Sequence, residues 1–335
     1  MKRKWPRILL MVVALLVIIY YLGPRPKVPA YDPILPVVPQ EAGMLEQYIA
    51  NKEAQHKLKP ENGAHIVWYD SVPRKTKYSV VYLHGFSASQ KEGDPVHLDF
   101  AKRYGCNLFL SRLDGHGIDT SDPLATMTAD GLWEDAKQAL SIGKALGEKV
   151  ILMTTSTGGT LALKLAATYP DDIFAIINMS PNIEINDNLV FLTNNPWGLE
   201  ISRLVRKSKY NVSKDEDSVR AKYWNRRYRL EAVGELENLV ETTMDPATFH
   251  KVKQPVLNLY YYKDPQHQDK TVRVSAILRM EEQLGTPDSL KEAIAIPEAG
   301  AHVLGSPMTS KDVPGVERAI DAFAEKKLKL VPATL

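Results

Sequence analysis

Ser156 stands where a catalytic nucleophile is expected. It follows the apolar run 150–153 and precedes two glycines in the stretch MTTSTGG of residues 153–159. A strand, a tight turn and a helix in this order lift a serine hydroxyl clear of a sheet, and the first N–H groups of the helix face developing negative charge. The usual turn is G-x-S-x-G, but Thr154 replaces the first glycine. We expect a nucleophile in a crowded turn, with a plain helix cap as the alternative.

A serine nucleophile needs an oxyanion hole and a base. The stretch LHGFSAS (83–89) follows an early strand and offers the backbone N–H of Phe86, and Thr157 offers a second N–H directly after the nucleophile. Among the eight histidines, only His302 lies in a loop after the last predicted strand, at the sheet edge where such folds place their sites. His302 is the expected base. His84 comes too early in the chain and is expected to orient its loop.

The acid that orients the histidine has two candidates in the segment YYYKDPQHQDKTVRVSAI (260–277). Asp264 follows a predicted strand almost at once, at the edge of the sheet where His302 is also expected. Asp269 precedes a predicted helix, where an acidic cap is common. One carboxylate suffices, because its role is to hold the histidine tautomer and to stabilise the imidazolium. We favour Asp264 and keep Asp269 as the alternative.

Strand-like and helix-like segments alternate along the chain and would position these residues. The predicted strands are 65–69, 78–84, 107–111, 150–154, 173–179, 256–262 and 293–296. The predicted helices are 41–57, 96–104, 132–146, 157–169, 272–284 and 316–328. The central strands are continuous apolar runs, which is typical of a parallel sheet covered on both faces. The pattern predicts an α/β fold.

One interval interrupts this alternation. Residues 182–249 contain no clear strand, only short helical stretches, and we interpret them as a helical cap inserted between the two parts of the catalytic domain, 61–181 and 250–335. Its aromatic residues, Trp197 and Trp224 among them, suit an apolar acyl pocket. Residues 203–229 hold ten basic side chains against three acidic ones. This charge would face either an anionic membrane or solvent.

The N-terminal segment 1–27 differs from the rest of the chain. Four basic residues precede the apolar run 8–22, which is shorter than the roughly 20 residues of a full membrane span. We expect a retained membrane anchor, with a cleaved signal peptide or a core helix as alternatives. The basic start keeps the N-terminus cytoplasmic, so the catalytic domain is expected outside the cytoplasm, either anchored or secreted or periplasmic after cleavage. Residues 28–60 form a proline-rich spacer and a leading helix.

Composition limits the remaining function classes. The 335 residues are 44% hydrophobic with a net charge of +2, which is ordinary for a globular protein and gives no reason to expect nucleic acid as a partner. Cys106 is the one cysteine and cannot form an internal disulfide. The chain has no H-E-x-x-H motif, no paired cysteines and no phosphate-binding glycine motif. We therefore expect neither a metal nor a cofactor.

Taken together and in order, the motifs resemble those of the α/β-hydrolase superfamily, and most closely its monoacylglycerol lipases and bacterial carboxylesterases, a serine aminopeptidase-like hydrolase group. The matching stretches are HGFSAS (84–89), SRLDGHG (111–117), the region around Trp133, STGGTLAL (156–163) and AGAHV (299–303). The resemblance covers residues 78–323 and departs from the family pattern at Thr154 and in the polar stretch 265–268. It implies that His116 is a structural loop residue.

The resemblance also implies an activity. Ser156 would attack a carboxylic ester of a small molecule or lipid, His302 would move the proton, and Phe86 and Thr157 would hold the oxyanion. A peptidase or amidase would use the same machinery, so it remains an alternative. A catalytically inactive binding domain on a membrane anchor is the third possibility.

Overall fold

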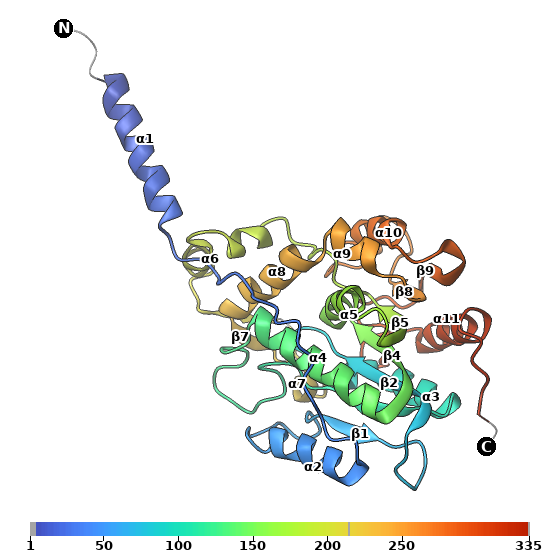
Figure 1. Ribbon diagram of the computed structural model, residues 1–335. Coiled ribbons are helices and arrows are strands. Elements are labelled where there is room, and N and C mark those ends of the chain that lie inside the picture. Colours follow the sequence, from blue (N-terminus) through green and yellow to red (C-terminus); the bar gives the residue numbers. More distant parts are fainter. Residues whose placement is uncertain (1–4, 214, 334–335) are drawn as a thin grey trace.

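The computed structural model of the protein describes residues 5–213 and 215–333 (Figure 1). Lys2, Arg3 and Lys4, on which the expected orientation of the N-terminus depends, lie outside the described residues. Lys214, one of the ten basic residues of the cap, also lies outside them.

A seven-stranded sheet forms the centre of the molecule, in the order β1-β3-β2-β4-β5-β8-β9 (Figure 1). Its strands are β1 (His65–Val67), β2 (Thr76–Leu83), β3 (Asn107–Leu110), β4 (Gly147–Thr155), β5 (Ile173–Met179), β8 (Val256–Tyr260) and β9 (Lys291–Ala295). β1 runs antiparallel to β3, and all other neighbouring pairs are parallel. The predicted α/β fold with a mostly parallel sheet is confirmed.

Helices cover both faces of this sheet, and each face encloses its own hydrophobic core. The first face is covered by α3 (Val96–Arg103) and α11 (Val313–Lys326). The second face is covered by α4 (Ala129–Leu146), α5 (Thr157–Thr168), α9 (Pro246–Lys251) and α10 (Val274–Gln283). Because β4 is covered on both sides, its residues 150–153 are all buried, which explains their unbroken apolar character.

The segment between β5 and α9 forms a cap beside the sheet. Its elements are η2 (Val190–Asn194), α6 (Gly198–Arg206), β6 (Tyr210–Val212), α7 (Arg220–Tyr223), β7 (Arg227–Arg229) and α8 (Glu231–Thr243). β6 and β7 pair as a small antiparallel ribbon. The expectation of a cap without strands is therefore wrong at this ribbon, because three-residue strands carry too little periodicity to be recognised.

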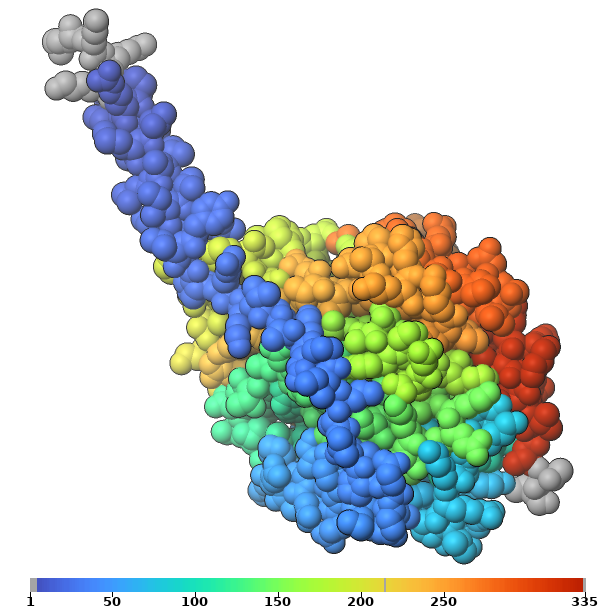
Figure 2. All heavy atoms as spheres, in the orientation of Figure 1, coloured from blue at the N-terminus to red at the C-terminus, as the bar shows by residue number. Residues whose placement is uncertain are grey.

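The proline-rich segment 24–39 forms neither helix nor strand, and it does not stand clear of the domain as the predicted spacer. It lies across the surface of the molecule (dark blue in Figure 2), and α2 (Ala42–Glu53) follows it. The indole N–H of Trp133 donates to the carbonyl of Asp32 at 2.8 Å, and Lys137 Nζ donates to the carbonyl of Ile34 at 2.8 Å. The segment is thus a strap bound to α4.

The N-terminal helix α1 (Trp5–Tyr21) projects from the body of the protein, and none of its residues is buried (Figures 1 and 2). It is 17 residues long. Among the described residues, 5–213 and 215–333, no helix combines the length and the apolar character needed to cross a membrane. The expected membrane-spanning anchor is therefore not supported.

Candidate active site

Ser156 occupies the turn between β4 and α5, as the N-cap residue of the helix. Its φ of 54° and ψ of −115° are strained values for a residue with a side chain. The two glycines that follow allow this turn. A β-carbon on Gly158 would lie 2.0 Å from the carbonyl oxygen of Leu83, and one on Gly159 would lie 2.6 Å from Cβ of Pro181. The sequence motif is therefore a strained elbow that presents the serine at the helix N-terminus.

Thr154 is accommodated by a chain of buried hydrogen bonds. Its hydroxyl donates to Oδ1 of Asn178 at 2.7 Å, and Nδ2 of Asn178 donates to Oδ1 of Asn258 at 2.9 Å. Nδ2 of Asn258 then donates to Oε2 of Glu281 at 2.6 Å. Thr154, Asn178 and Asn258 are register neighbours on β4, β5 and β8. The residue that replaces the usual glycine therefore has its hydroxyl satisfied inside the sheet.

His302 lies in the loop between β9 and α11. Its Nδ1 is 2.6 Å from Oδ2 of Asp269, and its Nε2 is buried without a hydrogen-bond partner among the described residues. The hydroxyl of Ser180 donates to the carbonyl of His302 at 2.7 Å and holds this loop from the end of β5. Ser180 is not predicted from the motifs, although its position at the carboxyl end of a predicted strand is a usable signal.

The aspartate beside His302 is Asp269, not Asp264. Asp269 is only 2% exposed, and its Oδ1 accepts the backbone N–H groups of Thr271 and Val272 at 2.8 and 3.2 Å. Burial would raise the pKa of Asp269, but the charge and hydrogen bond of His302 and these two N–H groups hold that pKa below its usual value. The carboxylate is therefore ionised at neutral pH.

The carboxylate of Asp264 forms hydrogen bonds within its own turn. The expectation that it orients His302 is therefore wrong. Its Oδ1 accepts the backbone N–H groups of Gln266 and His267 at 2.9 and 2.8 Å. The ring Nδ1 of His267 lies 2.9 Å from both carboxylate oxygens. This contact with His267 lowers the pKa of Asp264. A side chain engaged in this way near the surface does not reach His302.

Two buried histidines fix the loop that carries Phe86. Nε2 of His84 accepts the backbone N–H of Leu113 at 3.1 Å, so its Nδ1 carries the proton and donates to the carbonyl of Gly85 at 2.9 Å. Nε2 of His116 accepts the backbone N–H of Ser87 at 2.9 Å. Burial lowers the pKa of His84 to about 4 and places that of His116 well below its usual value, so both rings are neutral. Both histidines position the loop.

Ser156, His302, Phe86 and Thr157 all line one cavity of about 380 Å³. The cap supplies much of its remaining wall, with Val190, Trp224, Tyr228, Val233 and Leu236. The Tyr228 ring meets the Phe86 ring edge to face at 5.0 Å. Trp197 is not among the lining residues and instead donates to the carbonyl of Ile19 at 2.9 Å. Apolar side chains of the cap therefore line the same cavity as the groups able to attack a carbonyl carbon.

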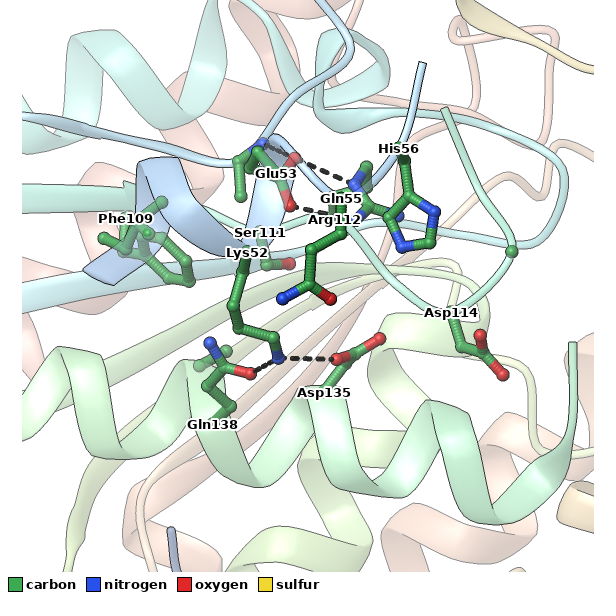
Figure 3. A pocket seen from close by; sticks show the side chains of 14 residues that line it. Lys52, Glu53, Gln55, His56, Phe109, Ser111, Arg112, Asp114, Asp135 and Gln138 are labelled. Atoms are coloured by element: carbon green, nitrogen blue, oxygen red, sulfur yellow. Dashed lines mark hydrogen bonds and ion pairs between the residues drawn. The ribbon is translucent and has the colours of Figure 1, made fainter. Parts of the chain in front are cut away.

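A second cavity, of about 150 Å³, lies beneath α2 and is more strongly polar (Figure 3). Figure 3 shows two pairs of charged side chains in it, Glu53 bonded to Arg112 and Lys52 directed at Asp135, while Asp114 stands apart. Arg112 Nε and Nη2 lie 2.8 and 2.9 Å from the Glu53 carboxylate. This bidentate pair joins α2 to the 111–117 loop that contains His116. The charged residues of this cavity therefore have a structural role.

Comparison with known protein families identifies the chain. A sequence profile described as serine aminopeptidase, S33, matches residues 74–280. The chain belongs to this hydrolase family. The match begins just before β2 and ends within α10, so it spans Ser156, Asp269 and the cap but ends before His302. The resemblance drawn from the sequence motifs is confirmed, and the protein is a hydrolase.

Comparison with curated proteins gave no significant match. Solved structures share the fold at low identity. A structure reported for LipS and LipT, two metagenome-derived lipolytic enzymes, is 18% identical with a TM-score of 0.64, over 80% of this chain and 100% of that one. The Paleococcus ferrophilus monoacylglycerol lipase is 15% identical, with a TM-score of 0.57 over 77% and 95% of the chains. The Saccharomyces cerevisiae monoglyceride lipase is 15% identical, with a TM-score of 0.57 over 81% of this chain and 92% of that one.

Proposed function

We propose that the protein hydrolyses carboxylic esters through an acyl-enzyme on Ser156. The observation that carries this proposal is the 2.6 Å contact between Asp269 and Nδ1 of His302, which leaves Nε2 buried and without a partner in residues 5–213 and 215–333. Because Nδ1 carries the proton toward the carboxylate, Nε2 is the basic nitrogen. Ser156 lines the same cavity as His302. A histidine held in this way can accept the proton of the serine hydroxyl.

The reaction follows from these groups. Ser156 Oγ attacks the ester carbonyl carbon while its proton moves to Nε2 of His302, and the carbonyl oxygen becomes an oxyanion. The N–H groups of Phe86 and Thr157 stabilise that oxygen. The intermediate then expels the alcohol, which takes the proton from His302, and an acyl-serine remains. Water attacks the acyl-serine by the same route, and the carboxylic acid leaves.

The apolar cap residues of the cavity support a substrate with an apolar acyl chain. The lipases whose structures resemble this one are named for ester substrates. The family description, by contrast, names an aminopeptidase. A matched pair separates the two: a butyrate ester of a phenol and the butyramide of the corresponding aniline. We expect the ester to be cleaved at least about 100-fold faster in kcat/KM, and a faster amide would favour the peptidase alternative.

The nucleophile is tested with a fluorophosphonate probe on the folded protein. The wild-type chain should be labelled and should hydrolyse the butyrate ester, whereas Ser156→Ala should lose both properties. Thr157→Ser is the matched control, since it keeps the backbone N–H and should still be labelled. A folded wild-type protein that neither reacts with the probe nor cleaves the ester would instead be the inactive binding domain.

We also infer that the enzyme works at a membrane on its outer side, where a small ester or lipid is the substrate. The exposed apolar side chains of α1 support this, as do Leu204 and Val205 of α6, which are 78% and 76% exposed. Arg206 and Lys207 flank this apolar patch. Flotation with lipid vesicles is the test: the full chain should float, and a chain lacking residues 1–22 should float less. The mass of the native protein distinguishes a retained from a cleaved segment.

A further inference from the structure

Glu92 is a buried carboxyl group beside the nucleophile that the proposed reaction does not use. It lies in η1 (Gln90–Gly93), is 2% exposed and lines the same cavity as Ser156 and His302. Its Oε1 accepts the backbone N–H of Gly85. Among the described residues, no basic side chain lies within ion-pair distance of it. Burying such a group as an anion costs free energy. We therefore ask what a buried carboxyl group does beside the nucleophile.

Gly85 separates the carboxyl group from the nucleophile by the width of one residue. A β-carbon on Gly85 would lie 3.0 Å from Cβ of Ser156 and 3.1 Å from Oε1 of Glu92. The carbonyl of Gly85 is held by His84 Nδ1 at 2.9 Å and by the N–H of Ala88 at 3.4 Å. In a planar peptide the C=O and the following N–H point in opposite directions, so these bonds also aim the N–H of Phe86. Glu92 binds the same glycine through its N–H group, which donates to Oε1.

The groups around Glu92 do not neutralise a negative charge. Tyr82 of β2 faces it, and its hydroxyl lies 2.8 Å from Thr155 Oγ1. His97 of α3 packs on Tyr82 at 4.7 Å, and burial lowers its pKa to about 4, which keeps it neutral. His302 approaches from the loop after β9 and lines the cavity. On the turn itself, Lys91 pairs with Asp94 at 3.0 Å instead.

Burial accordingly raises the pKa of Glu92 to about 8, against the opposing effect of the Gly85 hydrogen bond. Below that pH the side chain is a neutral acid that still accepts the N–H of Gly85. Above it, a negative charge appears directly behind the peptide that carries the oxyanion donor. In a buried site such a charge opposes the negative charge that forms on the substrate oxygen.

We propose that Glu92 is a positioning residue of the oxyanion hole, active as the neutral acid and inhibitory once ionised. This inference rests on the proposed serine-hydrolase function, because it needs an oxyanion to form beside Phe86. It predicts that kcat falls as the pH rises through the pKa of Glu92. The fall should appear in kcat more than in KM, since the charge acts on the transition state rather than on ground-state binding.

The test measures kcat and KM from pH 6 to pH 10 with methyl butyrate in a pH-stat. Wild type should lose about 25-fold in kcat between pH 7.5 and pH 9.5, as expected for one inhibitory ionisation with a pKa of about 8. Glu92→Gln cannot ionise, and its amide oxygen can still accept from Gly85, so its profile should be flat over this range. Glu92→Leu removes the acceptor and should lower kcat at pH 7 by about 10²-fold with little change in KM. Asp94→Asn is the charge-matched control on the same turn and should keep the wild-type profile.

An alkaline fall that persists in Glu92→Gln, or that disappears in Asp94→Asn, would overturn the proposal. So would a Glu92→Leu enzyme with the wild-type kcat at pH 7. Should Glu92→Leu fail to fold, as judged by its circular dichroism, the profile of Glu92→Gln decides alone. A wild-type protein without Ser156-dependent labelling at any pH would instead refute the proposed function, and the two failures are thereby distinguishable.

Discussion

At Asp269, one buried carboxylate serves two backbone N–H groups and one imidazole. Oδ1 takes the N–H groups of Thr271 and Val272, which leaves Oδ2 directed at His302. The turn therefore sets the direction of the carboxylate before the histidine makes its contact. An aspartate held in this way orients the ring and stabilises the imidazolium without taking up the proton itself.

Replacing this carboxylate by an amide gives the residue-scale prediction. Asp269→Asn should lower kcat by about 10⁴-fold, because the neutral amide neither stabilises the imidazolium nor enforces the tautomer with Nδ1 protonated. Asp264→Asn should change kcat by less than about twofold, since its carboxylate serves a surface turn. Steady-state kinetics on the butyrate ester compare the two variants. A larger loss at Asp264 than at Asp269 would contradict the assignment.

The sequence was sufficient for most of the site but not for this choice. Ser156, Phe86, Thr157 and His302 are each tied to a strand end or a helix start, and all four line one cavity. The two aspartates lie in one irregular loop, where neither periodicity nor distance from a strand gives the direction of a side chain. Asp264 and His267 satisfy each other at 2.9 Å, a local contact that chain order alone does not reveal.

Across β4, β5 and β8, a row of hydrogen-bonded polar side chains stands where a covered sheet usually has apolar contacts. Asn178 is its central member, bonded to Thr154 on one side and Asn258 on the other. Asn178→Ala should lower the free energy of unfolding by about 2–4 kcal/mol, because it leaves two buried groups without partners. Thr154→Val keeps the shape and should cost about 1–2 kcal/mol.

Urea denaturation of both single variants and of the double variant measures this coupling. The double variant should be more stable than the sum of the two single losses predicts, since the first substitution has already broken the shared bond. If the two losses in the free energy of unfolding are strictly additive, the two residues do not stabilise each other through a shared hydrogen bond. The kcat of Thr154→Val at pH 7 also tests whether the hydroxyl, beyond its stability effect, holds the elbow of Ser156.

The regular elements were predictable because their patterns are long. All seven central strands were found, although β4 begins at Gly147, earlier than its apolar run, because Gly147 pairs with Thr76 of β2. α4 begins at Ala129 because the hydroxyl of Thr128 caps the N–H of Gly131 at 2.9 Å. Such pairings and caps involve polar residues, and hydrophobic periodicity does not register them.

On the scale of the whole molecule, the N-terminal region has two parts with different roles. α1 buries none of its residues, whereas the strap that follows is bound along α4 and α8. The prolines predicted a segment without helix or strand, and residues 24–39 form neither. The prolines carried no information on the partners of the strap, because Trp133, Lys137 and Asn238 lie about a hundred to two hundred residues further along the chain.

This division predicts unequal effects of two truncations. Removal of residues 1–22 exposes no core surface and should leave the midpoint of thermal unfolding within about 2 °C of the full chain. Removal of residues 1–40 takes away the carbonyl acceptors of Trp133 and Lys137 and the buried side chain of Val38. It also uncovers Trp133, which is about 1% exposed, so the lost hydrogen bonds and packing should together cost about 2–4 kcal/mol. The midpoint should then fall by about 5 °C or more.

Differential scanning calorimetry on the three chains gives these midpoints. Because the strap contacts α4 and α8 but not Ser156 or His302, the shorter chain should keep its kcat at 20 °C as long as it remains folded. Equal midpoints for both truncations would show that the strap contributes nothing to stability and is a spacer, as the prolines alone indicated. A fall after removal of residues 1–22 would instead assign a structural role to α1, through its contact with Trp197.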